Sequence, residues 1–119
     1  MAEKSQSFRD VVVWQKAHAL TVRLDEYLPR IAEKKPRLAD QIGRAADSIP
    51  ANIAEGCGRE TKADFRRLLS MAVGSTTELE NHLIRAHAAG LLDTQDFHSL
   101  VSATIEIRKM LHGLRKSLS

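Results

Sequence analysis

Apolar residues recur every three or four positions through most of the chain, a spacing that places them on one face of a helix. The first such stretch follows Phe8 and Asp10, and Asp10 suits the position that caps a helix N-terminus. Its apolar face consists of Val13, Ala17, Leu20, Leu24, Leu28 and Ile31. The pattern predicts one long helix that ends before Lys34-Lys35-Pro36.

The second stretch carries two stripes. Leu38, Ile42, Ala45, Ile49 and Ile53 form an apolar stripe. About a quarter turn away, at roughly 100° per residue, lies a polar stripe of Gln41, Arg44, Ser48, Asn52 and Glu55. We expect Pro36 in the first turn of this helix and a kink, rather than an end, at Pro50. Gly56 is expected to supply the left-handed residue that closes it.

The third and fourth helices have clear starts and stops. Thr61 followed by Asp64 resembles a capping box, and Gly90 should end the third helix just after about Ala89. Asp93 or Thr94 should cap the fourth. The apolar face of the third helix is Phe65, Leu68, Leu69, Ala72, Thr76, Leu79, Leu83 and Ala86; that of the fourth is Phe97, Leu100, Val101, Thr104, Ile107, Leu111, Leu114 and Leu118.

Four amphipathic helices with short connections predict an all-α fold, an antiparallel up-down-up-down four-helix bundle. We expect residues 8–119 to form this single domain and residues 1–7 to be a flexible N-terminal tail. Gly74-Ser75, in the middle of the third helix, would allow another helix to approach closely.

Composition agrees with a helical domain and limits its chemistry. Among 119 residues there are three prolines, six glycines and 4% aromatics, so the core must be mainly aliphatic. The only cysteine, Cys57, excludes an intrachain disulfide. The sequence shows no signal peptide and no apolar run of about 18 residues that could span a membrane. We therefore expect a soluble cytoplasmic protein without a membrane partner.

The usual signatures of catalysis and cofactor binding are missing. The five histidines form no Glu-x-x-His pair, and His82 and His87 are five residues apart rather than four, so we expect no metal. Gly56-Cys57-Gly58 follows a helix instead of a strand, which rejects a dinucleotide fingerprint. Arg59 could lower the pKa of the Cys57 thiol, but no histidine partner is identifiable. We expect neither cofactor nor enzymatic activity, and a lone Glu55 defines no reaction.

The polar stripe has two interpretations. Gln41, Ser48, Asn52 and Glu55 could serve helix capping and hydrogen bonding at the edge of the bundle. We favour a contact between subunits held by directional polar groups.

Basic residues gather where the third helix begins. Arg59, Lys62 and Arg66 are three or four residues apart, so we expect them to face one side, with Arg67 adjacent. Such a stripe can neutralise phosphates, and the net charge of +3 permits an acidic partner such as RNA. Glu60 and Asp64 are interleaved with it, so a solvated charged face is the alternative.

Longer motifs carry a family resemblance. They are Phe8-Arg9-Asp10, Trp14-Gln15-Lys16-Ala17, Arg44 to Gly56, Phe65-Arg66-Arg67-Leu68-Leu69, and Gly74-Ser75 followed by Glu78-Leu79-Glu80. Together they resemble the intervening-sequence four-helix-bundle family, first noticed as open reading frames inside insertions in large-subunit ribosomal RNA genes. The resemblance extends from Phe8 to Leu114.

The resemblance implies a ring-like homopentamer. It also implies kinship with the accessory variability proteins of diversity-generating retroelements, which bind nucleic acid and a reverse transcriptase through a basic barrel. No family member is a known enzyme. The family-pattern positions present here are Asn52, Glu55, Gly56, Arg59, Gly74, Ser75 and Glu78. Gly43 and Val73 stand where a basic residue is usual in relatives.

These observations predict a non-enzymatic oligomeric scaffold that binds RNA or a ribonucleoprotein. The alternative is a protein–protein scaffold without affinity for nucleic acid. Our nucleic-acid candidates are Arg44, Arg59, Lys62, Arg66 and Arg67. Our subunit-interface candidates are Gln41, Ser48, Asn52, Glu55, Gly74, Ser75 and Glu78.

Overall fold

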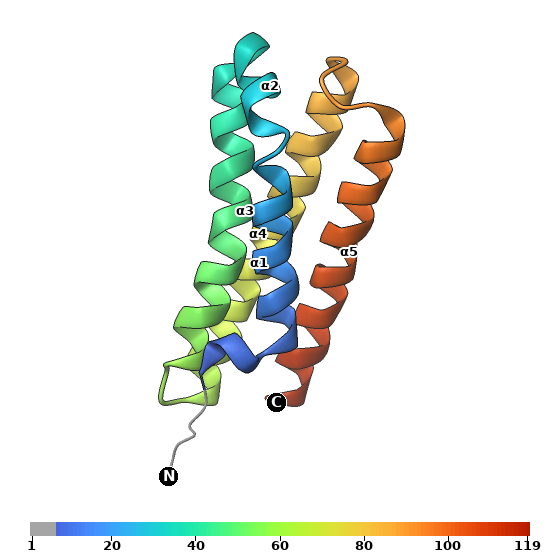
Figure 1. Ribbon diagram of the computed structural model, residues 1–119. Coiled ribbons are helices and arrows are strands. Elements are labelled where there is room, and N and C mark those ends of the chain that lie inside the picture. The colour runs from blue at the N-terminus through green and yellow to red at the C-terminus, as the bar shows by residue number, and fades with distance from the viewer. Residues whose placement is uncertain (1–6) are drawn as a thin grey trace.

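The computed structural model describes residues 7–119, and within them the fold is all-α, as predicted (Figure 1). The short 3₁₀ helix η1 (Phe8–Asp10) precedes five α-helices. These are α1 (Val12–Leu24), α2 (Leu28–Lys34), α3 (Pro36–Cys57), α4 (Lys62–Ala88) and α5 (Thr94–Ser117). The chain runs up through α1 and α2, down α3, up α4 and down α5 (Figure 1).

The predicted first helix is wrong in one respect, because it is divided into α1 and α2. Over Asp25–Tyr27 the backbone includes hydrogen bonds that span three residues rather than four. One example is the Tyr27 amide, which donates to the Leu24 carbonyl at 2.9 Å. Pro29 explains the division: it has no N–H to donate to the Asp25 carbonyl, and its ring would clash there in a continuous helix. Pro29 instead occupies the first turn of α2, where its missing N–H costs nothing. The bundle therefore has five α-helices rather than four.

Local signals set most other helix ends as expected. The Thr61 hydroxyl accepts from the Asp64 amide at 3.1 Å, and the Asp93 carboxylate accepts from the Asp96 amide at 2.7 Å. Gly90 follows α4 with a φ of +76°. At the first helix the expected cap is wrong, since Val11 rather than Asp10 is the N-cap of α1.

Most of the predicted tail lies outside the described residues. Ser7 belongs to the fold, because its hydroxyl accepts from the Arg9 amide and so caps η1. Pro50 lies inside α3, which continues without a break to Cys57.

Gly56 has a different role from the one predicted. It is a buried residue within α3, and the only left-handed residue among residues 7–119 is Gly90. A Cβ built on Gly56 would lie 2.7 Å from Cδ1 and 3.0 Å from Cε1 of Phe65. Gly56 is thus required because it has no side chain, which lets α3 approach the start of α4 closely. The ability of glycine to adopt a left-handed backbone is not used here.

The core is a continuous aliphatic cluster along the bundle axis, as the periodicity predicted. Its polar members are Thr76 and Thr104, whose hydroxyls donate to the carbonyls of Val73 and Leu100. Its largest fully buried apolar side chains are Leu24, Ile31, Ile42, Ile49, Ile53, Leu69, Leu79, Leu83, Leu100, Ile107 and Leu111. The molecule is elongated, 49 × 24 × 23 Å, so most of its surface is formed by the sides of helices. Over residues 7–119, no helix is both long and apolar enough to cross a membrane.

Candidate functional site

The polar stripe of α3 lies along its seam with α4, and a serine pair joins the two helices. The Oγ atoms of Ser48 and Ser75 are hydrogen-bonded to each other. Because the Ser75 hydroxyl also donates to the Met71 carbonyl at 3.2 Å, Ser48 is the donor in the pair. The pair aligns the two antiparallel helices near their midpoints.

Asn52 is also used within the chain. Its side-chain amide donates to the Ser48 carbonyl at 2.8 Å, one turn earlier in α3. Ser48, Asn52 and Ser75 are half-buried, and their contacts match the alternative of hydrogen bonding at the bundle edge. Their part in a subunit interface stays a prediction.

Gln41 and Glu78 lie on the same seam, toward the end where α3 begins. Gln41 lines an open hollow of about 750 Å³ together with Arg37 of α3 and His82 and Arg85 of α4. Glu78 Oε2 is 3.6 Å from Nε2 of His82. That nitrogen is buried and has no hydrogen-bond partner among the described residues. His82 therefore links the two predicted residues: it lines the hollow with Gln41 and lies beside Glu78.

Gly74 lies on a different side of α4, facing solvent. A Cβ built on it would meet nothing within 4 Å. Two other exposed residues with short side chains share this side at spacings of seven: Asn81 and Ala88. The exposed side chains of Met71 and Ile84 flank it, at 50% and 49% exposure. We call the set Gly74, Asn81 and Ala88 the small-residue side of α4.

Three of the predicted nucleic-acid residues form ion pairs on their own helix or the adjoining turn. Arg44 Nε is 2.8 Å from the Asp40 carboxylate, and Arg67 Nε is 3.5 Å from that of Asp64. Arg59 pairs with Glu55, another of the interface candidates. Exposed pairs of this kind contribute little to stability.

The expected one-sided stripe of Arg59, Lys62 and Arg66 is wrong at Arg59. The Arg59 side chain turns back to α3, whereas the Arg66 guanidinium donates to the Leu118 carbonyl of α5 at 2.6 Å. Spacing along the sequence misled here because Arg59 precedes α4 and does not follow its helical phase.

The structure instead brings Arg66 and Arg67 together with residues that the sequence analysis missed. With His112, Arg115 and Lys116 of α5 they line a hollow of about 560 Å³, which we call the α4–α5 basic pocket. Two short α4 side chains, Ala63 and Ser70, complete that side of it. The signal in the sequence was the spacing of His112, Arg115 and Lys116, which places all three on one side of the last turns of α5.

Cys57 is half-buried at the end of α3, and Glu55 lies one turn from Arg59. Burial raises the pKa of the Cys57 thiol, so the lowered pKa that Arg59 could have produced is wrong. Arg59 is engaged by Glu55 instead. Over residues 7–119 no three His, Cys, Asp or Glu side chains gather as a metal site would require.

Comparison with known proteins places this fold in a family. A model of the 23S rRNA-intervening sequence protein family matches residues 9–113. The chain is also similar to a protein of unknown function from the S23 ribosomal protein family of Bacteroides thetaiotaomicron VPI-5482. The two share 25% sequence identity with a TM-score of 0.82, over 87% of this chain and 98% of that one. No curated protein matches the chain. The resemblance inferred from the motifs is confirmed.

Proposed function

We propose that this chain, which belongs to the 23S rRNA-intervening sequence protein family, is a non-enzymatic scaffold. It would assemble with copies of itself and bind RNA or a ribonucleoprotein. We further propose a cytoplasmic ring of five subunits, as the family resemblance implies. The observation that carries the proposal is the small-residue side of α4, exposed along the longest helix of the bundle.

This side is suited to close packing against another helix. Small side chains let two helix backbones approach, and apolar neighbours such as Met71 and Ile84 then become buried. A glycine in an exposed helix interior costs about 1 kcal/mol relative to alanine. Gly74 has no intrachain contact that explains this cost, since nothing lies within 4 Å of its virtual Cβ.

A ring needs two different surfaces, because each subunit contacts the next head to tail. The second surface that we propose is the outer side of α1, where Val12 and Val22 are each 54% exposed and Ala19 is exposed between them. Both α1 and α4 pack against α3 and α5, so they occupy diagonal corners of the bundle (Figure 1). Two sites on opposite corners favour a closed ring over a two-fold dimer.

Gly74→Arg should reduce the molar mass in solution to that of a single chain, measured by light scattering after size-exclusion chromatography. Arginine is a good helix former, and the space at Gly74 is open in the isolated bundle. The subunit should therefore stay folded and lose only its partner.

Gly113→Arg is the matched control. Gly113 is also helical and exposed, and a Cβ there meets nothing within 4 Å. It should keep the mass of the unmodified protein. A monomeric unmodified protein, or a Gly74→Arg variant of unchanged mass, would contradict the proposed assembly.

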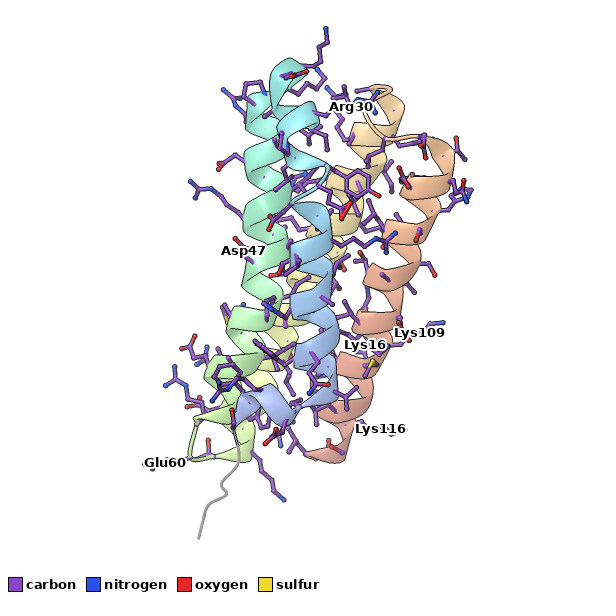
Figure 2. All side chains as sticks on the ribbon, viewed as in Figure 1. Lys16, Arg30, Asp47, Glu60, Lys109 and Lys116 are labelled. Carbon is purple, nitrogen blue, oxygen red and sulfur yellow. The ribbon has the colours of Figure 1, made fainter. Side chains whose placement is uncertain are left out.

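RNA is the partner that we propose for this scaffold, because two segments that meet at one end of the bundle carry an excess of positive charge. Residues 59–67 and 112–119 contain six Lys or Arg and only two Asp or Glu. Figure 2 shows Glu60 and Lys116 from these two segments at the same end of the molecule, and Arg30 at the other. A local excess of cations attracts phosphate and raises the association rate.

Structured RNA, labelled with a fluorophore, should bind with an affinity that falls linearly in a log–log plot against salt, measured by anisotropy. Replacing Arg59, Lys62 and Arg66 with glutamine should reduce the slope, by about one for each lost phosphate contact. The matched control replaces Arg30, Lys34 and Arg37, near the other end, with glutamine. Absence of binding at low salt would leave the protein–protein scaffold as the function.

A further inference from the structure

We propose that the α4–α5 basic pocket is a specific site for a phosphate group. Four permanent cations, Arg66, Arg67, Arg115 and Lys116, surround one hollow. Among the described residues, no Asp or Glu side chain lines it. The inference deepens the RNA contact proposed above and rests on it only for the identity of the larger ligand.

Two guanidinium groups of the pocket are held in place by the protein. The Arg115 Nη1 donates to Ser70 Oγ at 2.8 Å, and its Nη2 donates to His112 Nδ1 at 3.2 Å. Ser70 in turn donates to the Arg66 carbonyl at 3.0 Å, which ties the α5 side chain to the α4 backbone. Arg66 is held by the Leu118 carbonyl. Groups placed in advance lose less conformational entropy when they bind an anion.

The positioned groups retain donors for a ligand. A guanidinium has five N–H donors; the contacts above use one from Arg66 and two from Arg115. Arginine donors match phosphate oxygens in paired geometry, and such charge-assisted bonds are roughly twice as strong as neutral ones. Like charges that share a hollow repel one another, and a bound anion removes this repulsion. The pocket is half-open, as a phosphate carried on a longer molecule requires.

Part of this basic character has a structural use. Cations near the C-terminus of α5 complement its helix dipole, and Arg66 satisfies the carbonyl of the residue that caps α5. That role explains Arg66, Arg115 and Lys116 singly. It does not account for Arg67 of α4, which pairs with Asp64 and also lines the same hollow.

The test is a titration of the ¹⁵N-labelled protein with sodium pyrophosphate at constant ionic strength, followed by amide chemical shifts. We expect saturable shifts confined to α4 near Ser70 and to the last turns of α5. Arg115→Gln should weaken binding about tenfold, the loss of one charge-assisted bond. Because Arg115 also anchors Ser70, Lys116→Gln is the second variant, and it should weaken pyrophosphate binding without touching that anchor.

Lys109→Gln is the control, since it removes the same charge from an exposed position of α5 that lies outside the pocket. It should leave the pyrophosphate affinity unchanged. Shifts spread over the whole surface, or equal weakening by Lys109→Gln and Lys116→Gln, would overturn the site and indicate general charge attraction.

The RNA titration separates this inference from the proposed function. If pyrophosphate binds the pocket and RNA does not bind the protein, the site stands for a small phosphate ester and the RNA function falls. If RNA binds and pyrophosphate gives no localised shifts, the RNA function stands and the pocket is overturned. If both bind, Lys116→Gln should weaken RNA binding more than Lys109→Gln does, and equal effects would show that RNA binds elsewhere.

Discussion

Gly56→Ala should lower the free energy of unfolding by about 1–3 kcal/mol, the range for overpacking a close-packed site. The new methyl would lie 2.7 Å from a ring carbon of Phe65, and real side-chain contacts do not approach so closely. The new methyl would also lie 3.5 Å from Leu68 Cβ, an ordinary van der Waals contact, so the strain falls on the Phe65 ring. The gain in helix propensity of about 1 kcal/mol offsets only part of this cost.

Urea unfolding at one protein concentration measures this effect, and the chain offers two controls. Gly74→Ala and Gly113→Ala introduce the same methyl into helices where nothing lies within 4 Å. Both should stabilise the subunit by about 0.5–1 kcal/mol. In a Phe65→Leu background Gly56→Ala should cost less, because the clashing ring is gone. Equal effects at all three glycines would show that α3 and α4 do not approach closely at Gly56.

Arg108→Ala should destabilise the subunit by about 1–3 kcal/mol, between the values for exposed and buried ion pairs. Arg108 of α5 pairs with Glu80 of α4 and donates from Nε to the Thr76 hydroxyl at 3.1 Å. The two charged side chains are only 23% and 26% exposed. Removing the guanidinium leaves the Glu80 carboxylate in a poorly solvated place without its partner.

The matched control is Arg44→Ala, which removes an arginine from an ion pair that is 80% and 62% exposed. Its unfolding free energy should stay within about half a kcal/mol of the unmodified value. Replacing Arg108 and Glu80 together with methionine should recover most of the loss, since no buried charge remains unpaired. If Arg108→Ala costs no more than Arg44→Ala, the pair contributes no more than a surface contact.

These variants also separate folding from assembly. Gly56 and Arg108 act between helices of one chain, whereas Gly74 and Gly113 differ only in the surface that they face. Suppose that Gly56→Ala lowers stability and Gly74→Arg abolishes assembly. One side of the α3–α4 hairpin then serves folding within the chain, and the other serves contact with another subunit. Because assembly also raises apparent stability, all unfolding curves need the same chain concentration.

The local chemistry of the chain determined its helices and its core. Thr61, Asp93 and Gly90 act on backbone groups within a few residues, so their effects could be predicted from the sequence. The apolar stripe of α3 is buried at every predicted position, because a period of 3.6 residues places those side chains on one face. The division of the first helix at Asp25–Tyr27 also has a local cause, which is Pro29. The sequence analysis did not use this signal.

Only the tertiary structure decided which helix each long side chain meets. Arg59 and Arg66 are seven residues apart, yet one contacts α3 and the other α5. Gly56 was expected to turn the chain, but its role depends on a ring nine residues later that packing brings against it. Likewise the α4–α5 basic pocket joins residues 63–70 to residues 112–119. Such contacts depend on the register of antiparallel helices, which the whole set of core contacts determines and no local motif encodes.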